Sequence, residues 1–256
     1  LVTTPDVGTT LRLLLAAHLV AILGGAVYAL TVSGYRPATP SWQAARALVP
    51  QGARALPGRL AERLQTRVSL LLLGALAGTG SVGLFSVAIG LSEIVFFLSS
   101  SLATVLMSRN VDTDADVHAA AIRWLLPIGA LTAFAMAVAA PFVLARLYGA
   151  GFAPVIPLLH WLLPGAVAFS LIHVVSPALI QRGKAQDISL ASVTGLVVQV
   201  GLILWLVPTG GAGSAAIATL AAYGVSATMV ILAYSRDTGR SLQRVLLPTH
   251  ADVRAA

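Results

Sequence analysis

The chain contains no cysteine, and only 10% of its residues are charged. Without cysteine it can form neither disulfides nor thiolate metal sites. Ordinary globular domains have roughly 25% charged residues, so this composition excludes most soluble folds. The net charge of +7 does not predict nucleic-acid binding, because the basic residues are scattered between apolar runs and do not form one basic face.

Hydrophobic residues are abundant instead, at 57%, and the mean hydropathy is +0.89. A helix needs about 20 mostly apolar residues to cross a bilayer. Apolar stretches of this kind predict an all-α integral membrane protein with seven spans, at 11–32, 54–76, 82–107, 120–145, 155–180, 187–207 and 212–234. The weakest is 54–76, because its first half is polar; it is also compatible with an interfacial helix followed by a half-span.

The loops between these spans predict the orientation, since cytoplasmic loops carry the excess of lysine and arginine. If 54–76 crosses the membrane, nearly all basic loop residues fall on one side, while the turns 78–81 and 209–213 on the other side have no charge. We therefore expect a multi-pass protein of the plasma membrane with a cytoplasmic C-terminus.

Three regions follow from this topology. Residues 1–53 are expected to form the first transmembrane helix and a basic cytoplasmic linker, 54–234 a six-helix lobe, and 235–256 a basic cytoplasmic tail. Small residues recur every fourth position in the last span, which predicts a face for close helix packing; they are Ser214, Ala218, Ala222 and Ser226.

The most informative charges are Arg59, Arg63 and Arg67. Their spacing of four residues stacks them on one helix face. An arginine inside a span costs at least about 2.5–3.5 kcal/mol when inserted, which favours a cavity for Arg67 over lipid. Such a row suits an anionic headgroup such as a pyrophosphate, which arginine can bind bidentately. The alternative is that these side chains extend to the inner interface.

Glu93 is the acidic residue that lies well inside a predicted span, which makes it a functional candidate. Counted from the turn near residue 79, Glu93 and Arg67 both lie about 20 Å deep on consecutive antiparallel helices. Two interpretations remain open: a structural ion pair with Arg67, or a site for a coupling ion or proton.

No other pattern predicts chemistry. His18, His160 and His173 match no metal-binding signature and are interpreted as core histidines. No catalytic triad or pair of catalytic carboxylates can be assembled, so we expect no enzyme activity, no metal and no cofactor.

Four segments resemble the oligosaccharide and polysaccharide (O-antigen-type) flippases of the multidrug/oligosaccharidyl-lipid/polysaccharide flippase superfamily, in particular actinobacterial members. They are Leu64–Arg67 through Gly83–Ala88, Glu93–Arg109, Leu147–Phe152, and Ala178–Lys184 with Gly211–Thr219. Each string is short, but their order and their positions relative to the spans agree. The resemblance covers most of residues 50–250.

The resemblance implies the C-terminal lobe of a MATE-like bundle of two pseudosymmetric lobes, which moves lipid-linked anionic sugars through a cationic cavity for envelope polysaccharide export. The family's cavity arginines correspond by position to Arg63 and Arg67. The other lobe is absent from this sequence, so we expect either a longer protein or a partner chain. Two alternatives remain: a cation-coupled multidrug exporter of the related MATE type, with Glu93 as the coupling carboxylate, and a non-transporting scaffold for polysaccharide enzymes.

Overall fold

A computed structural model describes residues 7–31, 41–97, 101 and 115–242. The end of the predicted span 82–107 and most of the predicted tail 235–256 lie outside these residues. The chain divides into two units, Leu1–Leu48 and Val49–Ala256. All regular secondary structure in the described ranges is helical: α1 (Val7–Thr31), α2 (Trp42–Ser92), α4 (Ala115–Leu147), the 3-10 helix η1 (Ala150–Phe152), α5 (Val155–Gln181) and α6 (Ala185–Thr238).

Helix α1 belongs to the first unit and is apolar on every side. Large side chains around its circumference are exposed, among them Leu13, Val20, Ile22 and Tyr28. A helix without a polar face suits a hydrocarbon environment and not water. Its position in the chain matches the predicted span 11–32.

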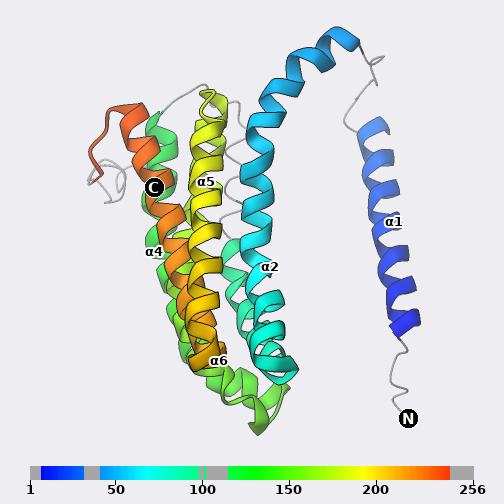
Figure 1. The fold of residues 1–256 in the computed structure, drawn as a ribbon. Coiled ribbons are helices and arrows are strands. Elements are labelled where there is room, and N and C mark those ends of the chain that lie inside the picture. The colour runs from blue at the N-terminus through cyan, green and yellow to red at the C-terminus, as the bar shows by residue number, and fades with distance from the viewer. Residues whose placement is uncertain (1–6, 32–40, 98–100, 102–114, 243–256) are drawn as a thin grey trace. The chain divides into compact units, whose positions relative to one another are not determined.

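Helices α2 and α6 each reverse direction at a glycine with positive φ, Gly78 (φ 80°) and Gly211 (φ 54°). The apolar stretch Gly52–Phe97, which contains most of α2 and the residues just after it, has 46 residues and would be about 70 Å long if straight, more than twice the roughly 30 Å hydrocarbon core. The reversal makes it a helical hairpin, which Figure 1 shows as the cyan and teal segments. Glycine is suited to this backbone because it has no Cβ.

These two reversals account for the predicted number of spans. The described residues contain five helices long and apolar enough to cross a membrane. Because α2 and α6 are each divided in two, the five helices provide seven helical segments, each matching one predicted span. The chain is therefore an all-α, multi-pass membrane protein with about seven transmembrane segments, as the hydropathy pattern predicts.

Helix α5 is the most buried of the apolar helices in the described structure. It packs against α4 and α6, and Figure 1 shows these helices side by side. Two apolar clusters result. One includes Leu73, Phe85 and Leu159, near the Gly78 and Gly211 turns; the other includes Ile172 and Tyr234, towards the opposite end of the bundle.

A layer of buried polar side chains lies where these two clusters meet. Gln199 donates from Nε2 to the Gln65 carbonyl oxygen (2.9 Å) and to Ser69 Oγ (2.8 Å). Gln65 in turn donates to Ser226 Oγ (3.0 Å). Interhelical hydrogen bonds of this type contribute on average about 0.6 kcal/mol each in membrane proteins. The layer joins α2 to both halves of α6, and the predicted small-residue face is buried there at Ala218, Ala222 and Ser226.

Candidate functional site

The first half of α2 has two faces of different character. One face is buried and runs through Ala61, Gln65, Ser69 and Leu73, which are at most 3% exposed. The opposite face holds the predicted row Arg59, Arg63 and Arg67, all exposed. This division explains why the predicted span 54–76 looks polar. Its core face includes the buried polar layer, its arginines are exposed, and Glu62 is a buried charge between the two faces.

The arginine row lines a cavity of about 640 Å³. The first half of α2, the segment 93–97 that follows α2, and helix α5 form its walls, through Arg59, Glu62, Arg63, Thr66, Arg67, Glu93, Phe96, Phe97, Phe169 and His173. The structure thus brings together all four residues singled out in the sequence: the three arginines and Glu93. It also adds two titratable groups that the sequence analysis did not assign to a site, Glu62 and His173.

Arg67 and Glu93 face each other across the α2 hairpin. Arg67 Nη1 lies 3.9 Å from Glu93 Oε1, and the side chains are 62% and 26% exposed. A pair this long and this exposed contributes little to stability, about 0–1 kcal/mol. The contact therefore leaves Arg67 able to turn towards a ligand in the cavity.

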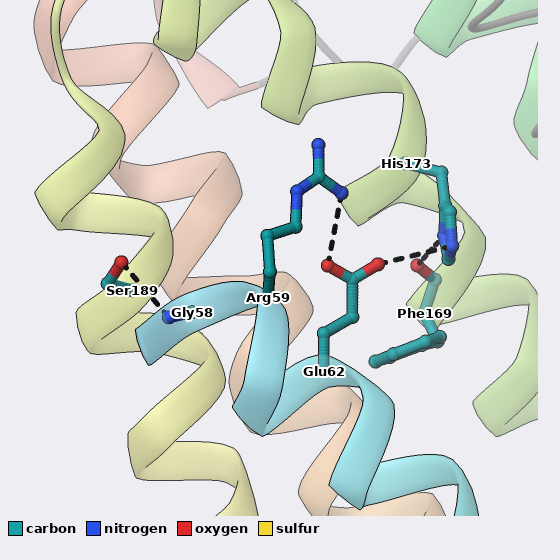
Figure 2. A network of polar contacts seen from close by, with 6 residues as sticks. All are labelled: Gly58, Arg59, Glu62, Phe169, His173 and Ser189. Atoms are coloured by element: carbon teal, nitrogen blue, oxygen red, sulfur yellow. Dashed lines mark hydrogen bonds and ion pairs between the residues drawn. The ribbon is translucent and has the colours of Figure 1, made fainter. Parts of the chain in front are cut away.

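Glu62 lies at the centre of a second polar cluster, shown in Figure 2. Its Oε2 accepts a hydrogen bond from Arg59 Nη1 at 3.4 Å, and its Oε1 lies 3.3 Å from His173 Nε2. The Glu62 side chain is only 9% exposed. A buried carboxylate is costly unless it is paired, and these two contacts supply the pairing. Because Glu62 follows Arg59 by three residues, helical spacing alone predicts their proximity.

Contacts with α6 hold this part of α2 in place. The backbone N–H of Gly58 donates to Ser189 Oγ (3.2 Å), and Ser189 donates to the Arg54 carbonyl oxygen (2.7 Å). A Cβ at position 58 would lie 2.7 Å from the Ser189 Cα, so only glycine allows this approach. The close packing sets the position of the next residue, Arg59, at the cavity.

The cavity has an excess of positive charge. Three arginines and two glutamates line it, which leaves a formal charge of +1 when His173 is neutral. Arg59 is paired with Glu62, and Arg67 lies near Glu93. Among the described residues, Arg63 makes no side-chain hydrogen bond or ion pair. The site therefore offers one unneutralised guanidinium flanked by two that are weakly paired.

An aromatic cluster forms the α5 wall. The rings of Phe96 and Phe169 lie 5.3 Å apart, and Phe169 stacks on Tyr223 at 4.2 Å. His173 stacks on Phe96 at 6.0 Å. Phe96 and Phe169 give the cavity aromatic lining beside its arginines, so the cavity is suited to a ligand with both charged and apolar parts.

The other predicted histidines lie elsewhere. In α1, His18 contacts the Leu14 carbonyl oxygen at 2.8 Å, and in α5, His160 lies 3.5 Å from the Ala137 carbonyl oxygen. Within the described residues, no group of three histidine, aspartate or glutamate side chains could hold a metal ion. His173 is partly buried and packs against Phe96 and Phe169, and it also lines the cavity.

Comparison with known proteins identifies the fold. No protein-family model matches the chain, and no curated protein matches it in sequence. A solved structure, the outward-facing conformation of a multidrug resistance MATE family transporter of the MOP superfamily, is similar to it with a TM-score of 0.58 and 22% identity. The match covers 81% of this chain and 49% of that transporter.

The chain thus spans about half the length of the transporter that it resembles. At this identity the likeness establishes the fold alone. A charged cavity lies between α2 and α5 in the second unit. We conclude that the chain is a multi-pass helical membrane protein whose fold is that of about one half of a MATE-type transporter.

Proposed function

We propose that the chain is part of a membrane transporter that flips lipid-linked oligosaccharide for envelope polysaccharide export. In this proposal it is the C-terminal lobe, it lies in the plasma membrane, and it performs no enzymatic reaction. Arg63 and Arg67 attract the pyrophosphate headgroup, with Arg59 beside them, while the lipid chain stays in the bilayer. The opposite wall of the transport path comes from an N-terminal lobe or a partner chain.

The observation that carries this proposal is the charge of the cavity. Arg63 has no partner in the described structure, and its neighbours Arg59 and Arg67 are held only by contacts of 3.4 and 3.9 Å. A guanidinium inside a membrane bundle is costly unless it faces a cavity or an anion. Arginine is also the side chain best suited to bidentate phosphate binding. The site is therefore suited to an anionic amphiphile.

The test is headgroup flipping by the full-length protein reconstituted in liposomes, together with a separately encoded partner lobe if there is one. We expect Arg63→Ala to slow the flipping of a pyrophosphate-linked oligosaccharide by about tenfold or more, because a charged hydrogen bond is worth about 1.5–3 kcal/mol. Arg67→Ala should act in the same direction. Arg146→Ala is the matched control, since Arg146 is exposed in the last turn of α4 and does not line the cavity.

An Arg63→Ala protein that flips at the wild-type rate would rule out the assigned role. The alternative, a cation-coupled multidrug exporter, is favoured by Glu93 in the cavity and by the name of the matched transporter. It predicts drug resistance that depends on Glu93. We prefer the anionic substrate, because both cavity carboxylates already lie beside arginines and the net charge repels cations.

A further inference from the structure

His173 is placed so that both nitrogens of its ring face hydrogen-bond acceptors. Nδ1 lies 3.4 Å from the Phe169 carbonyl oxygen, one turn earlier in α5. Nε2 lies 3.3 Å from Glu62 Oε1 on α2. Figure 2 shows the contacts of the ring with these two oxygen atoms as dashed lines. Neither acceptor can supply a proton when Glu62 is ionised.

A neutral histidine beside an ionised glutamate can donate to only one of these two oxygen atoms. Neutral imidazole has a single N–H group, so one ring nitrogen would direct its lone pair at an oxygen. An added proton removes the conflict in either of two ways. The imidazolium donates to both acceptors, or protonated Glu62 donates to Nε2 while Nδ1–H donates to the Phe169 carbonyl. Both arrangements contain the same number of protons.

We propose that Glu62 and His173 form a proton-binding site within the cavity, and that this site binds its proton cooperatively with the anionic headgroup. The inference rests on the function proposed above. The cavity then binds two ligands, a proton and the anion. Both are bound at the same time, in the same conformation of the transporter.

The surrounding charges determine the sign of this coupling. The three arginines of α2 and Glu93 line the same cavity as Glu62 and His173. On α6, the nearby titratable group is Tyr223, which stacks on Phe169. On α4, Arg123 is buried and does not line the cavity. With the pair unprotonated, the formal charge of the cavity is +1. One bound proton raises it to +2, which matches the dianionic pyrophosphate bridge of a lipid-linked sugar.

Arg59 provides a direct route for the coupling. Its Nη1 lies 3.4 Å from Glu62 Oε2, and its side chain is half exposed. When the pair carries a proton, Glu62 either shares its charge with an imidazolium or loses it. In both cases the attraction between Glu62 and Arg59 weakens, and the guanidinium becomes available to the anion. By thermodynamic reciprocity, a bound anion must also strengthen proton binding.

The experiment measures binding of UDP-glucose by calorimetry to the full-length protein in nanodiscs, between about pH 5 and pH 8, the range in which imidazoles change charge. UDP-glucose contains a pyrophosphate diester, whose charge stays constant over this range. We expect wild-type affinity to increase on the order of tenfold as the pH falls. Repeating the titration in buffers of different ionisation enthalpy should reveal net proton uptake on binding.

Two variants make the test specific. His173→Gln should bind the probe with no proton uptake and little pH dependence. Glu62→Gln should bind it more tightly at the high end of the pH range, since it removes a negative charge and releases Arg59. The matched control is His160→Gln, because His160 lies on α5 outside the cavity, and it should retain the wild-type pH profile.

The outcomes separate this inference from the proposed function. Wild-type binding of the probe without proton uptake would overturn the proton site alone, as would full pH dependence in His173→Gln. A wild-type protein that binds no probe at any pH would instead overturn the anion-binding function on which the inference rests.

Discussion

At the scale of single residues, Glu93 separates the two transport hypotheses most clearly. Its carboxylate lies 3.9 Å from Arg67 and lines the cavity. If the cavity binds an anion, Glu93 opposes binding by partly neutralising Arg67. If it binds a coupling cation or a cationic drug, Glu93 is required. The same substitution therefore has opposite effects under the two hypotheses.

We expect Glu93→Gln to tighten binding of a pyrophosphate diester by roughly three- to tenfold, because it removes one negative charge close to the ligand. Calorimetry on the full-length protein measures this, and Asp187→Asn, at the start of α6 outside the cavity, is the control. Weaker anion binding, accompanied by loss of drug efflux from cells, would favour the multidrug exporter instead.

Which site residues could be predicted from sequence depends on how local their interactions are. The row Arg59, Arg63 and Arg67 follows from helical spacing within one segment. The approach of Arg67 to Glu93 follows from counting residues on either side of one turn. The contact between Glu62 and His173 joins α2 to α5 across a long stretch of chain, and no periodicity indicates it. Long-range packing decides that contact.

At the scale of elements, glycines at close contacts are the points where the bundle tolerates least change. Gly195 in α6 faces Ser226 Oγ and Gln65 Nε2, and a Cβ there would overlap both atoms. The position lies beside the buried polar layer, where α2 meets both halves of α6. Gly201, six residues later in the same helix, has no atom within 4 Å of a Cβ position.

We expect Gly195→Ala to lower the free energy of unfolding by about 1–3 kcal/mol, because the added methyl group overpacks this junction. Gly201→Ala is the matched control and should be neutral or stabilising by up to about 1 kcal/mol, as alanine is the better helix former. Denaturation of the protein in mild detergent measures both. Equal effects of the two substitutions would show that the junction is not packed as described.

The sequence predicts these elements well where hydrophobicity alone decides them. All seven predicted spans correspond to helical segments, and the uncharged turns 78–81 and 209–213 contain the reversals at Gly78 and Gly211. The polar first half of 54–76 is difficult to interpret without the structure, because Gln65 and Ser69 are buried against α6 while the arginines face a cavity. Composition does not reveal which polar residues are buried.

At the scale of the whole molecule, the chain matches 49% of a transporter, and its cavity is lined, within the described structure, by α2, the segment 93–97 that follows it, and α5. Alternating access requires a second wall that moves relative to the first. The half-length match and the one-sided cavity are consistent with each other. They are the reason why the proposed transport function includes a second lobe.

The orientation of that assembly in the membrane depends on the distribution of loop charges. The turn between α5 and α6 contains Arg182 and Lys184, whereas the turn at Gly211 is uncharged. Basic loops stay on the cytoplasmic side, so the α5–α6 turn should be cytoplasmic and the Gly211 turn external. We expect the end of α6, with Arg236 in its last turn, to lie on the cytoplasmic side as well.

Because the chain has no cysteine, single cysteines report this topology without background. We expect a membrane-impermeant maleimide to label Thr209→Cys in intact cells and Gln181→Cys only after lysis. Both positions are exposed at helix ends and leave the loop charges unchanged. Leu204→Cys, on the lipid-exposed part of α6, should resist labelling under both conditions. Labelling of Gln181→Cys in intact cells would show that the protein has the opposite orientation, with its C-terminus outside. The arginine row would then not enter the membrane from the cytoplasmic side.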